Sequence, residues 1–223
     1  MNEVIGEILP LALGVAISPI PIIAAILMLL SPRAKGTSLG FLLGWVLGIL
    51  AAVVVFTLLA SVLPEAGDDS SKPVAGTVKI VLGVLLLLLA VKQWRSRPTG
   101  DTEPALPHWM QAIDTMTPGR ALVLGALLSG LNPKNLLMGA AAGIAVGSAD
   151  LALDRSAITI ALYTVIAAST VAVPVIAYLA AAARMAAPLA TLRTWLVHNS
   201  STVMAVLLLV IGVLLIGKGI GSY

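Results

Sequence analysis

Six stretches of the chain consist almost entirely of hydrophobic residues, separated by short polar segments. They cover about residues 4–30, 36–63, 74–94, 119–147, 156–182 and 200–217. A membrane-spanning helix needs about 20 mainly apolar residues. The pattern therefore predicts an all-α integral membrane protein with six transmembrane helices. Because the segments between them are short, residues 1–223 are expected to form a single transmembrane domain.

Prolines interrupt the first and fourth stretches at matching positions. The sequences at these points are Ser18-Pro19-Ile20-Pro21 and Asn132-Pro133-Lys134-Asn135. Each half of the chain is predicted to cross three times, so the second half enters the membrane from the opposite side. This predicts two inverted three-helix repeats, about residues 1–94 and 119–223, joined by a connector over about 95–118. Many secondary transporters are built this way, with the site where two broken helices meet.

Each break is predicted to be the start of a new half-helix. Proline suits the first turn of a helix, and Ser18 and Asn132 stand where a side-chain oxygen can cap it. At about 1.5 Å per residue, both breaks lie roughly 20 Å into their spans, near the middle of the bilayer. Two positively polarised helix ends are then expected to face one another, an arrangement that binds anions.

Lys134 is the one ionisable residue deep inside a predicted span. Charges inside a membrane are costly and therefore indicate a functional site. Lys134 is expected to face an anionic head group or to change protonation during transport; the alternative is that it pairs with carbonyl groups freed by the break. The predicted substrate-binding residues are Ser18, Pro19, Pro21, Asn132, Pro133, Lys134 and Asn135.

The composition excludes several kinds of chemistry. Hydrophobic residues make up 59% of the chain and charged residues 10%, whereas soluble domains are about 25% charged. The chain has no cysteine and two histidines, which excludes disulfides and thiol redox chemistry and leaves little for a metal cluster. The net charge of +3 comes from scattered residues, so nucleic-acid binding is not expected. We also expect no cofactor and no enzymatic activity.

The distribution of Lys and Arg predicts the orientation. With the N-terminus outside, the inner loops hold Arg33, Lys35, Lys92, Arg95, Arg97, Arg120, Arg184 and Arg193, and the outer segments hold Lys72, Lys79, Arg155 and Lys218. Cytoplasmic loops are enriched in basic residues. Both termini are therefore predicted to lie outside the plasma membrane.

Other features are less specific. In the connector, one helical face carries Leu106, Trp109, Met110, Ile113 and Met116, which predicts a short helix in the membrane interface. Glycines recur at every fourth position from Gly36 to Gly48 and from Gly139 to Gly147. They favour close helix packing and also permit a homodimer. Pro174 predicts a kink in the fifth span.

Several motifs resemble those of a known family. Pro19-Ile20-Pro21 and Asn132-Pro133-Lys134 look like the paired signatures of the LysE-type exporter superfamily, small six-span proteins that export amino acids and other solutes. Residues 11–23, 30–36, 109–114, 117–120 and 128–135 are more closely similar to the GAP or Sap family of actinobacterial lipid-addressing proteins. This resemblance implies a plasma-membrane transporter of a lipid or lipid-linked glycan. Pro-Ile-Pro replaces the Pro-Gly-Pro usual in the amino-acid exporters, which argues against an amino-acid substrate.

The leading prediction is a transporter that moves an anionic envelope lipid by alternating access, with membrane lipids and an anionic amphiphile as its partners. One alternative is a LysE-like exporter of small solutes, which predicts a narrow, water-accessible cavity closed to lipid instead of a lateral opening between helices. The other is a non-transporting accessory protein of an envelope-lipid export machine, which predicts tolerance of changes at both breaks.

Overall fold

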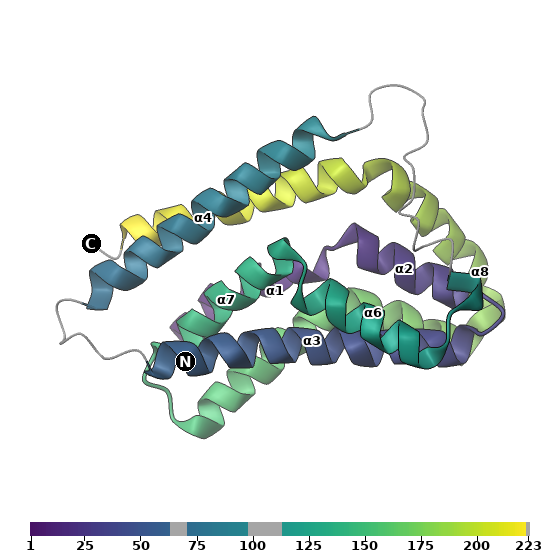
Figure 1. Cartoon of the computed structure of the whole chain (residues 1–223), viewed down its shortest axis with the longest axis horizontal. Coiled ribbons are helices and arrows are strands. Elements are labelled where there is room, and N and C mark those ends of the chain that lie inside the picture. The colour runs from purple at the N-terminus through teal and green to yellow at the C-terminus, as the bar shows by residue number, and fades with distance from the viewer. Residues whose placement is uncertain (63–70, 98–112, 222–223) are drawn as a thin grey trace.

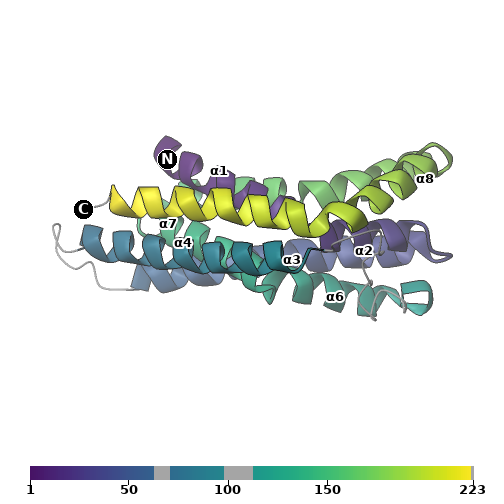
Figure 2. The same ribbon diagram turned by 90° about the horizontal axis from the view of Figure 1, so that it is seen from above.

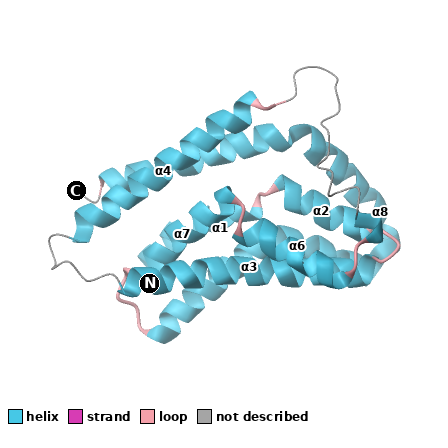
Figure 3. Cartoon of the chain, viewed as in Figure 1, coloured by secondary structure: helices cyan, strands magenta, loops and turns pink. Residues whose placement is uncertain are grey.

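The computed structural model describes residues 1–62, 71–97 and 113–221, and these residues are helical almost throughout (Figure 3). Their helices are α1 (Asn2–Ala16), α2 (Pro19–Leu29), α3 (Ala34–Val62), α4 (Ser71–Arg95), the 3-10 helix η1 (Ile113–Thr115), α6 (Pro118–Gly130), α7 (Pro133–Gly147) and α8 (Leu153–Ile220). Most of them run along the long axis of the molecule, and α1 begins at the end where α8 finishes (Figures 1 and 2).

The helices have the length and composition of membrane spans. Ala34–Ser61, Gly76–Arg95 and Leu153–Ile220 are each apolar and long enough to cross a bilayer. Two further candidates are bent pairs, α1 with α2 at 51° and α6 with α7 at 63°, which makes up to five candidates among the described residues. The predicted interruptions of the first and fourth spans are therefore confirmed, and the chain is an all-helical membrane protein.

The last third of the chain differs from the sequence prediction. Residues 183–199, expected to form a loop, are helical and belong to the 68-residue helix α8. They are rich in alanine, the best helix former. The non-helical residue within α8 is Ala181, with φ −148° and ψ 56°, and not the predicted kink residue Pro174. Ala181 divides α8 into residues 153–180 and 182–220, between which the chain turns back (Figure 1).

Glycines bring α3 against both halves of the second broken helix. A Cβ at Gly40 would overlap the carbonyl group of Pro118, and one at Gly44 would overlap that of Leu122, both on α6. A Cβ at Gly143 of α7 would lie 2.6 Å from the Cβ of Phe56 on α3. Both glycine stripes are thus covered within one chain, and the predicted homodimer can no longer be argued from them.

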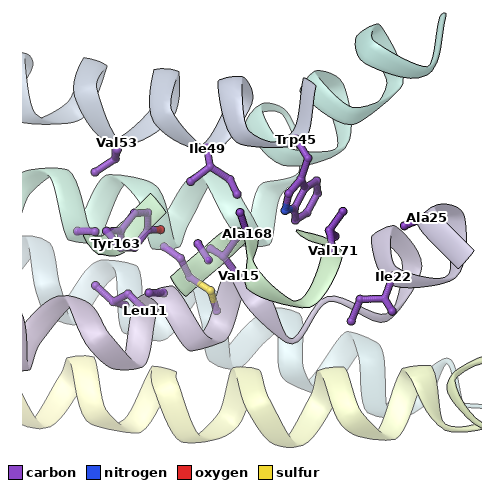
Figure 4. Close-up of a cluster of buried hydrophobic side chains, with 14 of the residues drawn as sticks. Leu11, Val15, Ile22, Ala25, Trp45, Ile49, Val53, Tyr163, Ala168 and Val171 are labelled. Carbon is purple, nitrogen blue, oxygen red and sulfur yellow. The ribbon is translucent and has the colours of Figure 1, made fainter. Parts of the chain in front are cut away.

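Large apolar side chains lie on both the inside and the outside of the bundle. Trp45, Ile49 and Val53 point from α3 toward α1 and α8 and are buried (Figure 4). On another face of α3, four large residues are 37–52% exposed: Leu39, Leu43, Leu47 and Leu50. Exposed apolar surface of this extent suits contact with lipid and not with water.

A separate pair of helices is formed by α4 and the later part of α8, which lie side by side (Figures 1 and 2). Glycines bring the two helices together, because a Cβ at Gly83 would lie 2.7 Å from the Gly212 carbonyl oxygen and one at Gly219 would lie 2.7 Å from the Gly76 carbonyl oxygen. Glu7 connects this pair to α1, since its carboxylate is 3.0 Å from the Lys79 ammonium and 3.9 Å from that of Lys218.

The predicted interfacial helix of the connector falls largely outside the described residues. Leu106, Trp109 and Met110 belong to residues 98–112. Ile113 and Met116 are described; Ile113 begins η1 and is buried.

Close packing of α3 on α6 predicts that Gly44→Ala is destabilising. The added methyl group overlaps the backbone of Leu122, and overpacking costs about 1–3 kcal/mol or more. We expect a lower midpoint of thermal unfolding in detergent. Gly6→Ala is the matched control, because no atom lies within 4 Å of its added Cβ. Equal midpoints for Gly44→Ala and wild type would contradict the α3–α6 contact.

Candidate functional site

The first break separates α1 from α2. Pro19 and Pro21 cannot donate backbone hydrogen bonds, and a proline disfavours helical geometry in the residue before it. Ser18 is accordingly extended, with φ −116° and ψ 97°. Ile17, with φ −79° and ψ 69°, also leaves the helix. The break is thus a direct result of the Pro-Ile-Pro sequence.

The second break separates α6 from α7 and is capped as predicted. Asn132 is extended, and its side-chain oxygen accepts a hydrogen bond of 3.0 Å from the backbone N–H of Lys134. Pro133 occupies the first turn of α7, where its missing N–H costs nothing.

Lys134 connects the two breaks. Its side chain is buried, with 3% relative exposure. The ammonium group donates to the Gly14 carbonyl at 2.6 Å, the Ser18 hydroxyl at 2.7 Å and the Ile17 carbonyl at 3.3 Å. We call these three hydrogen bonds the Lys134 bridge. A lysine ammonium has three donors, so the bridge uses all of them.

The Lys134 bridge agrees with the second of the two predictions for this residue, that it pairs with carbonyl groups freed by the break. Its acceptors are uncharged and lie at the C-terminal end of α1, where the helix dipole is negative. The structure therefore directs Lys134 toward the protein, and not toward a head group, in this conformation.

The C-terminal carbonyl groups of α1 are all hydrogen-bonded. Besides the two that Lys134 contacts, Leu13 accepts from the Ile17 N–H, Val15 from the Ser18 hydroxyl, and Ala16 from the Ser18 N–H at 2.8 Å and the Thr170 hydroxyl at 2.5 Å. Buried backbone groups need such partners. The predicted site residues included neither Gly14 nor Thr170.

Ser18 does not cap α2, contrary to the prediction. Its hydroxyl donates to the Val15 carbonyl at 2.6 Å and makes no capping bond. A capping residue accepts from the second or third N–H of the helix, and Pro21 lacks the third. Because Pro19 lacks one too, Ile20 carries the only backbone donor of the first three residues of α2. This helix end therefore offers few donors to an anion.

At the second break, Asn135 donates a hydrogen bond to a backbone carbonyl group, as Lys134 does at the first. It is 3% exposed, and its side-chain amide donates to the Leu128 carbonyl at 3.1 Å. Gly14 and Leu128 occupy equivalent places, four residues before Ser18 and Asn132 respectively. The Ser18 hydroxyl lies 3.5 Å from the Asn135 side-chain oxygen. Ser18, Lys134 and Asn135 thus form one buried cluster with half-buried Asn132 beside it, and the three prolines shape the backbone around it.

The space beside this cluster is small. A crevice lined by Val15, Ile49, Ala52, Ser129, Asn135, Gly139 and Tyr163 has no room for a water molecule. The Tyr163 hydroxyl is buried there without a hydrogen-bond partner (Figure 4). Among the described residues, no group of three His, Asp or Glu side chains is placed to hold a metal ion.

A larger space lies between α1 and the later part of α8. This lateral groove has a volume of about 580 Å³ and is lined by Pro10, Leu13, Gly14, Ile17, Trp195, Asn199, Thr202, Val203, Val206, Leu207, Val210, Ile211 and Leu214. Gly14 belongs to both the groove and the Lys134 bridge. The sequence prediction did not identify the residues of the groove, because Trp195 and Asn199 at its polar end lie in residues expected to form a loop.

The Lys134 bridge predicts that Lys134→Met is destabilising. The variant leaves two buried acceptors, the Gly14 carbonyl and the Ser18 hydroxyl, and the part-buried Ile17 carbonyl without their donor. Each unsatisfied buried group costs about 1–3 kcal/mol, so we expect a loss of about 2–4 kcal/mol in the free energy of unfolding. SDS-induced unfolding followed by circular dichroism measures it. Lys35→Met makes the same chemical change at an exposed position and should have little effect. Equal losses in the two variants would argue against the bridge.

The model of a protein family matches nearly the whole chain. The family is described as Sap, sulfolipid-1-addressing protein, and the match covers residues 8–221, which include both breaks and the lateral groove. No curated protein and no solved structure matches the chain. A match of this length shows that the chain belongs to the sulfolipid-1-addressing protein (Sap) family.

Proposed function

We propose that this chain is a plasma-membrane transporter that moves an anionic envelope lipid or lipid-linked glycan by alternating access. Membership of a family named for addressing a sulfolipid supports a role in lipid export or addressing. The active transporting role, the anionic cargo, the plasma-membrane location and a wider relation to the LysE superfamily are parts of the proposal. So is the absence of an enzymatic reaction.

The order of the helices supports two inverted three-helix repeats. In this scheme α1–α2, α3 and α4 correspond to α6–α7 and the two parts of α8, which then crosses twice and brings the number of spans to six. The two broken helices run in opposite directions in Figure 1. Gly83 of α4 and Gly212 of the later part of α8, helices that correspond in this scheme, also approach each other. Opposed repeats of this kind suit alternating access.

The lateral groove is the observation that favours a lipid cargo. A small-solute exporter predicts a water-accessible cavity closed to lipid, but the crevice beside the breaks has no room for water. The groove holds about 580 Å³, and its lining includes residues at the surface, such as Leu13 and Val206, each 51% exposed. A site of this kind is reached from the bilayer.

The Lys134 bridge provides a mechanism for holding one conformation. Alternating access requires the two broken helices to move relative to each other. The bridge joins the start of α7 to the end of α1, so it must loosen during that movement. Ser18 and Asn135 belong to the same cluster, while Asn132 and the prolines keep the breaks in place.

The fully hydrogen-bonded state of Lys134 also favours a second candidate function, an accessory protein that does not transport. A polar cluster with every ammonium donor in use can serve a purely structural purpose. Transport measurements on the purified protein separate the two candidates.

The proposed orientation places both termini outside. The chain has no cysteine, so single cysteines can be introduced directly. Gly6, Gly119 and Gly217 suit this because nothing lies within 4 Å of an added Cβ at any of them. In intact cells, a membrane-impermeant maleimide should label Gly6→Cys and Gly217→Cys, and should label Gly119→Cys only after the membrane is opened. The opposite labelling pattern would show that both termini lie inside and would contradict the proposed orientation.

Lipid transfer in vesicles tests the transporting role. The probes are fluorescent sulfatide and the matching galactosylceramide, which lacks the sulfate, and dithionite quenching reports movement between leaflets. We expect the protein to accelerate sulfatide transfer roughly tenfold or more over empty vesicles, a barrier change of only about 1.4 kcal/mol. Lys134→Met should alter this rate and Lys35→Met should not. Folded protein that moves neither lipid would instead support the accessory role.

A further inference from the structure

The lateral groove is polar at one end and apolar along the rest of its length. Trp195, Asn199 and Thr202 line the first end, and every α8 residue from Val203 to Leu214 that lines it is apolar. From Trp195 to Leu214 the helix rises roughly 30 Å at about 1.5 Å per residue. This matches the thickness of the hydrocarbon core, about 30 Å. The polarity pattern of the groove therefore suits a lipid whose head group lies near one membrane surface and whose long acyl chain extends through the hydrocarbon core.

The groove is open on its bilayer side. Trp195 and Val206 are each 51% exposed and Val210 is 49% exposed, although all three line the groove. Its lining contains no charged side chain. A volume of about 580 Å³ lies within the range of ligand-binding pockets, about 300–1,000 Å³. An occupant that enters from this side comes from the surrounding lipid.

The two ends of the groove differ in the charged residues near them. No Asp or Glu follows Asp154 in the sequence, whereas Arg184 and Arg193 precede the Trp195 end on α8. The Arg193 Nε is buried and has no hydrogen-bond partner. At the Leu214 end, Glu7 is paired with Lys79 at 3.0 Å. Lys218, the basic residue of α8 at this end, also lies 3.9 Å from Glu7. The ion pairs found among the described residues include neither Arg184 nor Arg193. Unpaired positive charge therefore lies near the Trp195 end, which complements an anionic head group.

The floor of the groove is connected to the break. Gly14 lines the groove, and its carbonyl oxygen accepts the shortest hydrogen bond of Lys134, at 2.6 Å. A Cβ at Gly14 would meet the side chains of Ile211 and Met138. The absence of a side chain here lets α1 approach α7 and α8 while the backbone faces the groove.

We propose that the lateral groove binds one acyl chain of an anionic membrane lipid, with the head group at the Trp195 end and the chain tip near Leu214. This inference rests on the proposed function, because it names the path by which the lipid cargo meets the protein. It places the anionic head beside α8 and not at Lys134, whose ammonium group is occupied by the protein's own acceptors.

Photocrosslinking in vesicles tests the groove. The probe is sulfatide with a diazirine on its acyl chain, and peptide mass spectrometry locates the crosslinks. We expect Val206, Val210 and Leu214 to be labelled roughly tenfold more than the lipid-facing residues Leu58, Leu88 and Val165, the ratio that a preference of about 1.4 kcal/mol gives. These three controls are 60%, 62% and 68% exposed, respectively.

Two substitutions provide a matched comparison. Val206→Trp fills the groove and should reduce labelling of Val210 and Leu214 to the level of the controls. Val165→Trp adds the same side chain on the earlier part of α8 and should leave the pattern unchanged. If Val206→Trp does not fold, the labelling pattern of the wild-type protein still decides the question.

The possible outcomes are distinct from those of the transport experiment. Equal labelling of the groove residues and the other lipid-facing residues would overturn the proposed lipid-binding site, whether or not lipid is transferred. Equal labelling by the galactosylceramide probe would overturn the assignment of an anionic head group. Groove labelling without any lipid transfer would uphold the binding site and count against the transporting role.

Discussion

The structure depends on satisfying the backbone groups that two interrupted helices leave free inside a membrane. No water is present in the hydrocarbon core to hydrogen-bond them, and each unpaired group there costs several kcal/mol. The first break is satisfied largely by side chains from elsewhere in the fold, Lys134 of α7 and Thr170 of α8. The second is served by its own residues Asn132 and Asn135. The first break is thus stable only when the halves of the chain are assembled.

The same requirement explains what could be predicted from the sequence. Proline chemistry is local, so Pro19 and Pro133 placed both breaks correctly, and Asn132 could be recognised as a cap. The partners of Lys134 could not be predicted, because Gly14 and Ser18 lie 120 and 116 residues away in the sequence. The sequence does not show which helix ends meet in the fold. The missing cap at Ser18 could not be predicted either, because Ile20 keeps the N–H that corresponds to the capped N–H of Lys134, and the Ser18 hydroxyl bonds to the Val15 carbonyl instead.

Helix packing divides the molecule into a tightly packed part and a more open part. Glycines let α3 contact α6 and α7 at backbone distance, so these helices have little freedom to separate without losing contacts. The pair formed by α4 and the later part of α8 is packed less closely against α1. Ion pairs of Glu7 join them at one end, and the lateral groove separates α1 from α8 beyond those ion pairs. Hydrophobic periodicity predicts that helices will pack, but it does not predict which pair leaves a gap.

Gly14 has a place in two structures at once, as the floor of the groove and as an acceptor of Lys134. Events on its two sides are therefore thermodynamically linked. Any occupant that shifts this peptide group changes the strength with which the lysine is held, and by reciprocity the state of the lysine changes the affinity for the occupant by the same factor. A residue without a side chain thereby becomes the point of communication between the bilayer and the protein interior.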